Sequence, residues 1–156
     1  MIASAQTLRS LRPVEPFEER GVAGGMSFGL SAAGYDVRFH KADCKEGSMG
    51  YTLAPGEFTL ASTLERFKMP TNLLGIVHDK STWARAGLAV QNTVIEPGWE
   101  GYLTLELTNH GPGMLYFLKG MPIAQIVFHL LDHPTESPYD GKYQHQEAGP
   151  QHARYE

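Results

Sequence analysis

The chain has 156 residues, a formal net charge of −4 and a pI near 6.0, with 42% hydrophobic and 19% charged residues. This length suits one domain with a sizeable core, and this composition is that of a globular chain rather than a disordered or fibrous one. The acidic balance argues against broad, sequence-independent nucleic-acid binding, which needs a basic surface. We therefore expect no nucleic-acid partner.

The single cysteine, Cys44, excludes an internal disulfide framework and a Cys-rich zinc site, and it fits a reducing compartment. No apolar run approaches the ~20 residues needed to span a bilayer, and residues 1–13 lack the apolar centre of a signal peptide. These features predict a cytoplasmic protein with no membrane partner. Nothing in the segment around Cys44 marks it as a nucleophile.

A short helix is predicted over residues 3–11, from the spacing of Leu8 and Leu11, with Ser4 as its cap and Pro13 closing it. A second helical turn is predicted over 81–87, where Gly87 stops it.

Short alternating segments separated by Gly, Pro and Asn follow the first helix, as is typical of a β-sandwich or barrel. They predict strands at 35–39, 58–63, 73–78, 88–95, 102–108, 114–118 and 124–131. After Asp132 the chain is polar and has no periodicity. We therefore predict a single mainly β domain over 1–132 and an extended C-terminal tail over 133–156.

The strand at 102–108 carries a carboxylate whose role the alternation does not reveal. Leu103, Leu105 and Leu107 fall on one face, and Glu106 falls on the other. Most Glu residues sit in water, so on this segment alone a solvated strand face is the favoured interpretation of Glu106.

The segment HDKSTWARAG places Lys80, Ser81, Thr82 and Arg85 where a strand meets a helical turn. Free backbone N–H groups, a hydroxyl and two cations could converge there on a phosphate. The alternative is a capped surface turn with solvated cations.

The tail combines aromatic rings, a cation and an amide at Tyr139, Lys142, Tyr143 and Gln146. Such a segment often closes over a ligand, and simple disorder is the alternative interpretation.

The seven histidines do not predict a metal site. His129 and His133 are separated by a strand end, so the helical i, i+4 geometry is not available to them. His145 and Glu147 form an H-x-E without the P-C-x-x-C that completes a zinc deaminase signature.

Several segments, in chain order, resemble the dUTPase and dCTP deaminase superfamily, namely 32–39, 75–88, 94–109, 120–128 and 138–146. KSTWARAGL is similar to the deaminase pattern R/K-S-S-x-x-R-x-G-L, and TLELTN is similar to the deaminase strand with a central Glu. The tail resembles the deaminase lid, and no Gly-rich dUTPase closing motif is present. The deaminase branch is therefore the closer one.

The resemblance implies a dUTPase-like distorted jelly-roll subunit of the β-clip type, with one or two short helices, that forms a homotrimer with active sites at subunit interfaces. Glu106 would deprotonate a water that attacks C4 of cytosine. Ser81 would help to position that water, and Arg85 would lie beside Glu106 and keep it ionised.

The resemblance also implies a deoxynucleoside triphosphate substrate, with Mg²⁺ carried by the triphosphate and no catalytic metal. The substrate-binding residues that it implies are Lys80, Thr93, Glu96, Trp99, Gln125, Tyr139, Lys142 and Gln146.

The implied activity is deamination of dCTP to dUTP and ammonia, which supplies thymidylate precursors. A dUTPase or a bifunctional enzyme remains an alternative, because the 88–96 hairpin is two residues shorter than is usual in this superfamily and carries Glu96 where Asp is usual. A non-catalytic nucleotide-binding homologue is the second alternative, although such a protein would not need a general base.

Overall fold

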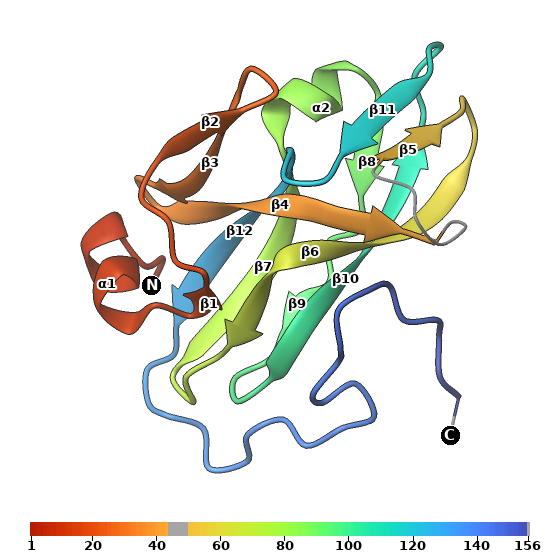
Figure 1. Cartoon of the computed structure of the whole chain (residues 1–156). Helices are drawn as coiled ribbons and strands as arrows, with labels where there is room; N and C mark the ends of the chain where they lie inside the picture. Colours follow the sequence, from red (N-terminus) through yellow and green to blue (C-terminus); the bar gives the residue numbers. More distant parts are fainter. Residues whose placement is uncertain (44–49, 156) are drawn as a thin grey trace.

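The structure is a computed structural model that describes residues 1–43 and 50–155, and its chain is mainly β (Figure 1). Cys44 lies outside the described residues. The helices are α1 (Ala5–Leu11) and α2 (Ser81–Arg85). The strands are β1 (Val14–Glu15), β2 (Gly21–Ala23), β3 (Met26–Ser31), β4 (Gly34–Ala42), β5 (Gly50–Leu53), β6 (Phe58–Lys68), β7 (Leu73–Asp79), β8 (Leu88–Val90), β9 (Val94–Ile95), β10 (Glu100–Asn109), β11 (Leu115–Leu118) and β12 (Pro122–Leu130).

Most strands form one antiparallel sheet, in the order β8-β10-β6-β4-β12-β7-β9, with β1, β2 and β3 attached beside this path. The sheet is curled, and the loop at 91–93 joins the strands at its two ends. Gln91 N donates to Glu106 O at 3.1 Å, and Val77 N donates to Thr93 O at 3.1 Å. The loop is therefore fixed to β10 on one side and to β7 on the other. β5 and β11 form a separate two-stranded sheet.

The alternation predicted for β10 is confirmed at Leu105, Glu106 and Leu107, since both leucines are fully buried in the core while Glu106 is half-buried. It is wrong at Leu103, which lines the same cavity as Glu106. The pairing of β10 with β6 shifts register between Tyr102 and Thr104, as in a β-bulge.

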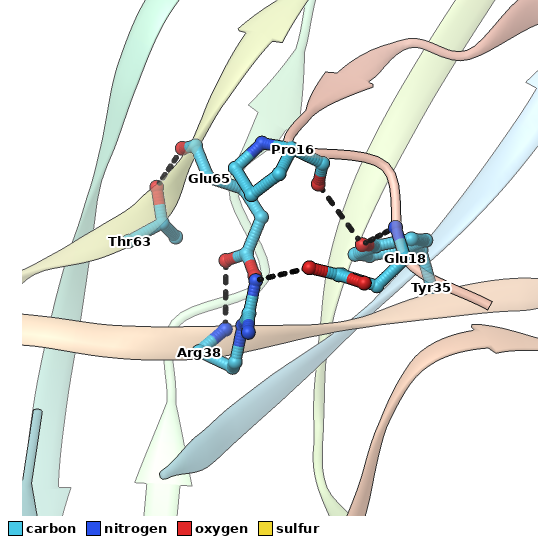
Figure 2. A network of polar contacts seen from close by, with 6 residues as sticks. All are labelled: Pro16, Glu18, Tyr35, Arg38, Thr63 and Glu65. Atoms are coloured by element: carbon cyan, nitrogen blue, oxygen red, sulfur yellow. Dashed lines mark hydrogen bonds and ion pairs between the residues drawn. The ribbon is translucent and has the colours of Figure 1, made fainter. Parts of the chain in front are cut away.

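A buried polar network ties β4 to β6 and to the segment after β1 (Figure 2). Arg38 donates to both carboxylate oxygens of Glu65, from Nε at 2.7 Å and from its backbone N at 2.8 Å. The Tyr35 hydroxyl donates to Pro16 O and accepts from Glu18 N, at 3.2 and 2.9 Å. The central strands of the sheet are therefore held by charge-assisted hydrogen bonds as well as by the backbone ladder.

Both predicted helices are present. Ser4 caps α1 by accepting from Thr7 N, and Arg12 closes the helix with a left-handed φ of 46°. Gly87 follows α2 with a φ of +98°, and a Cβ there would lie 2.3 Å from Gly111 N, so this stop requires glycine. Within the described residues, neither helix is long and apolar enough to cross a membrane.

One predicted strand is wrong in its extent, because 88–95 forms two short strands, β8 and β9, with a loop between them. The loop residues Gln91 and Thr93 make their hydrogen bonds outside a ladder, which periodicity does not reveal. The short strands β1, β2, β3 and β5 were not predicted, since two to six residues carry too little alternation.

Candidate active site

Glu106 lines a cavity of about 690 Å³ between β6, β9, β10 and the C-terminal tail. The wall combines apolar side chains, among them Phe58, Leu60 and Leu103, with a small number of polar ones. This mixture is typical of a small-molecule site. Of the residues predicted from the sequence, those that line this cavity are Thr93, Glu96, Trp99, Glu106, Tyr139 and Gln146.

One oxygen of the Glu106 carboxylate, Oε2, is buried without a hydrogen-bond partner among the described residues. Burial raises the pKa of the Glu106 carboxyl above its usual range, and a backbone hydrogen bond only partly opposes this. A buried, unpaired carboxylate oxygen costs free energy, so this position favours a proton or an added donor.

Tail residues Tyr139, Tyr143, Gln146 and Gln151 line this cavity. In Figure 1 the tail is the dark blue segment that leads to the C-terminus. Trp99 Nε1 donates to Tyr143 O at 2.7 Å, and Tyr102 N donates to Gln146 O at 2.9 Å. Gln151 N donates to Thr104 Oγ1 at 3.0 Å. These contacts place tail residues along the length of β10.

The tail makes specific backbone contacts and no long ladder of its own. Gln146 forms an isolated parallel bridge with Gly101. A Cβ on Gly101 would lie 2.7 Å from Gln146 N, so glycine allows this close approach.

A second cavity, of about 550 Å³, is lined by Lys80, Ser81 and Gln125 from the predicted set. Asp36 also lines it. Gln125 is the register partner of Asp36 on the adjacent strand, so their side chains project from the same face of the sheet.

The cations and hydroxyl predicted around α2 therefore differ in their burial and in their contacts. Lys80 is buried, and its Nζ lies 2.8 Å from Asp36 Oδ2. Ser81 is exposed and lies at the wall of the second cavity. Arg85 is exposed, and its Nη1 donates to Ser81 O at 3.1 Å.

A single chain does not gather the whole predicted set into one cavity. Glu106 lines one cavity and Ser81 lines the other, while Arg85 and Lys142 line neither of these two. Lys142 Nζ lies 5.7 Å from the centroid of the Tyr143 ring. The expected contact between Arg85 and Glu106 is absent from the interactions of the described residues.

Sequence reasoning did not select several lining residues. Leu60 and Leu103 were missed because an apolar strand residue reads as core. Gln151 and His152 were missed because the end of the tail has no pattern. Asp36 stood in a resembling segment, and its position between the apolar residues Tyr35 and Val37 was the available signal.

The described residues contain no group of three or more His, Cys, Asp or Glu side chains arranged to hold a metal ion.

The curled β subunit is that of dUTPase-like proteins. A 2′-deoxycytidine 5′-triphosphate deaminase from Agrobacterium tumefaciens superposes with a TM-score of 0.65 at 16% identity, over 83% of this chain and 47% of that chain. The dUTPase of Staphylococcus bacteriophage 80alpha with dUPNHPP superposes with a TM-score of 0.56 at 16% identity, over 81% and 84%. The predicted fold class is thus confirmed, and the homotrimer stays a prediction.

The chain belongs to the dCTP deaminase-like family, whose model matches residues 37–131. It is 37% identical to a dCTP deaminase of Gemmatimonas aurantiaca, over 85% of this chain and 86% of that protein. It is 36% identical to a dCTP deaminase of Campylobacter fetus, over 86% of each chain. The resemblance derived from the sequence is confirmed.

Proposed function

We propose that the protein is a dCTP deaminase, which converts dCTP to dUTP and ammonia. The observation that carries this proposal is Glu106: a carboxylate with an unsatisfied oxygen, half-buried in a mostly apolar cavity. Its relatives of 34–37% identity bear the name dCTP deaminase. A general base held among apolar side chains suits attack of water on a bound base.

In the proposed reaction, Glu106 removes a proton from water as the oxygen attacks C4 of the cytosine ring. The carboxyl gives this proton to N3, then takes the remaining proton of the new C4 hydroxyl and delivers it to the amino group, which leaves as ammonia while the C4=O bond forms. Because burial raises the pKa of Glu106, its carboxylate is a stronger base than an exposed one, which suits the uptake of a proton from water.

The proposed active site joins the two cavities across a subunit interface of a homotrimer. Ser81 and Arg85 of one subunit would meet Glu106 of the next, where Ser81 orients the water. The Arg85 guanidinium would supply the donor that Glu106 Oε2 lacks within the described chain. Oligomers of this kind build sites from repeated, identical contacts.

The substrate would lie with its base near Thr93 and Trp99 and its 3′-hydroxyl near Glu96, all at the Glu106 cavity. Lys80 and Gln125 would bind the phosphates at the second cavity. Lys142 and Gln146 would join them as the tail closes over the substrate.

Mg²⁺ would be carried by the triphosphate, which is the way this ion usually meets nucleotide sites. A dUTPase from phage phi11 of S. aureus has a structural Mg(II) ion. In this proposal deamination itself uses no metal, since Glu106 serves as the base.

A bifunctional enzyme or a dUTPase is the second candidate. Glu96 lines the same cavity as Glu106, so a water activated there could attack the α-phosphate. A product-resolved assay separates the two: the purified protein is incubated with each natural deoxynucleoside triphosphate, and ammonia and pyrophosphate are measured. Ammonia alone from dCTP supports the proposal, whereas pyrophosphate supports the second candidate.

A further inference from the structure

The ion pair between Lys80 and Asp36 is the most deeply buried Lys contact described. Lys80 is 8% exposed, Asp36 is 5% exposed, and Nζ lies 2.8 Å from Oδ2. The partners come from the start of α2 and from β4, 44 residues apart in sequence. The contact therefore fixes the lysine relative to the central sheet.

The Lys80 ammonium has N–H donors that the bond to Asp36 does not use. An ammonium carries three N–H donors, and among the described residues Nζ donates to Asp36 Oδ2. Both side chains line the 550 Å³ cavity together with Gln125. The remaining N–H groups are thus available to a ligand in that cavity.

Burial of the Lys80–Asp36 pair costs free energy that a role in folding stability alone does not explain. Two charges lose their hydration on burial, and an apolar pair of similar volume is often at least as stable. Asp36 Oδ1 is also buried without a partner among the described residues, which adds to the cost. A role in orienting Lys80 accounts for an arrangement that stability by itself does not favour.

We propose that Asp36 is a positioning residue that aims the Lys80 ammonium at the triphosphate of the substrate. This inference rests on the proposed function and deepens it. Asp36 holds one N–H of Lys80, and the others face the phosphate oxygens. The lysine is ordered before the substrate arrives, so less conformational entropy is lost on binding.

The proposal predicts that removing the Asp36 charge weakens phosphate binding, whereas simple electrostatics predicts that it strengthens binding. A carboxylate beside a phosphate site repels the ligand, so removing its charge should strengthen binding if Asp36 were a bystander. If Asp36 positions Lys80, Asp36→Asn should weaken binding instead. Asp79 supplies the matched control, since it lines the same cavity while its Oδ1 accepts from Val90 N.

The first test is calorimetric binding of inorganic tripolyphosphate to the full-length variants Asp36→Asn, Lys80→Met, the double variant and Asp79→Asn. Asp36→Asn should weaken binding about tenfold, as expected for one charge-assisted hydrogen bond. The double variant should be no weaker than Lys80→Met, and Asp79→Asn should not weaken binding. Tighter binding by Asp36→Asn, or an equal loss in the Lys80→Met background, would overturn the proposal.

Steady-state kinetics adds a readout that a merely structural role would not reproduce. Asp36→Asn should raise KM for dCTP with kcat nearly unchanged, because the phosphates lie away from the reacting C4. A fall in kcat with unchanged KM would contradict a positioning role.

A measurement on the unaltered protein covers the case in which Asp36→Asn fails to fold. In ¹⁵N-lysine NMR, the Lys80 ammonium protons should exchange slowly, shift when tripolyphosphate is added, and stay protected. If tripolyphosphate causes no chemical-shift change, or if the ammonium protons lose their protection from exchange on binding, the phosphate does not bind a Lys80 that is paired with Asp36. Because the probe has no base, these results stand apart from whether dCTP is deaminated.

Discussion

At the scale of single residues, two opposing influences determine the pKa of the Glu106 carboxyl. Burial raises the pKa of its carboxyl, while a guanidinium placed beside it would lower that pKa. The base must be ionised to accept a proton, so the deamination rate should rise with pH through the apparent pKa of this group.

Arg85→Ala should move the acid limb of the pH–rate profile to higher pH, because burial then raises the pKa of Glu106 without the opposing cation. The measurement is kcat/KM for dCTP across the acidic range. Arg12→Ala is the control, since that guanidinium lies over the Phe17 ring at 5.6 Å and outside both cavities. An unshifted limb in Arg85→Ala would separate Arg85 from Glu106.

At the same scale, the sequence predicted the strand face on which Glu106 lies, but it did not predict which residues surround that side chain. Alternation put Glu106 on the face opposite Leu105, and that is correct. That face is enclosed by Tyr143 and Gln151, which are far along the chain. A local period of two residues carries no information about such distant contacts.

At the scale of elements, the Arg38–Glu65 pair clamps β4, which carries Asp36, to β6, the neighbour of β10. Burial raises the pKa of Glu65 and the Arg38 donors oppose that shift. Glu65 has no exposed surface and the Arg38 side chain is 12% exposed. Loss of one partner would leave the other charge buried and uncompensated.

Glu65→Gln should lower the free energy of unfolding by about 3–5 kcal/mol. Glu100→Gln is the matched control, because the Glu100–Arg66 pair is on the surface, with side chains 26% and 37% exposed. That change should cost no more than about 1 kcal/mol. Urea unfolding monitored by circular dichroism compares them, and equal losses would contradict a clamping role for the buried pair.

The C-terminal tail is the second element whose role can be tested. Deleting 138–156 should leave a cooperative unfolding transition, since the strand core lies outside the tail. It should weaken dCTP binding, because tail residues line the Glu106 cavity. It should also red-shift the emission of Trp99, which is 5% exposed and donates to Tyr143 O. Unchanged dCTP affinity after deletion would remove the tail from the site.

The elements themselves were predictable to different degrees. β10 matches the segment predicted at 102–108 closely, because a half-buried strand repeats its pattern many times. β6 begins where predicted but continues to Lys68, beyond the predicted 58–63. The 88–95 segment was taken as one strand since its apolar residues continue across the turn. Its division depends on Gln91 and Thr93 bonding to β10 and β7.

At the scale of the whole molecule, Ser81 and Glu106 line different cavities, so the proposed mechanism needs a neighbouring subunit to bring them together. Light scattering at micromolar concentration should give the mass of a trimer. A monomer that nonetheless deaminates dCTP would show that one chain suffices.

Mixed oligomers test the shared site directly. Arg85→Ala subunits should keep weak activity and Glu106→Gln subunits none, and refolding them together should raise the activity above that of either variant alone, because some interfaces then receive an intact residue from each side. Mixtures no more active than Arg85→Ala, although mass spectrometry shows mixed oligomers, would place both residues in the same subunit's site.

The central claim is that Glu106 is the base that deaminates dCTP, and it is tested by ammonia release and dCTP binding in parallel. Glu106→Gln keeps the shape of the side chain but cannot take a proton from water, so ammonia release should be abolished while dCTP affinity and the unfolding midpoint are preserved. Glu15→Gln, at an exposed carboxylate on β1, should match the unaltered protein. If Glu106→Gln retains most of the ammonia release, the proposed mechanism is contradicted.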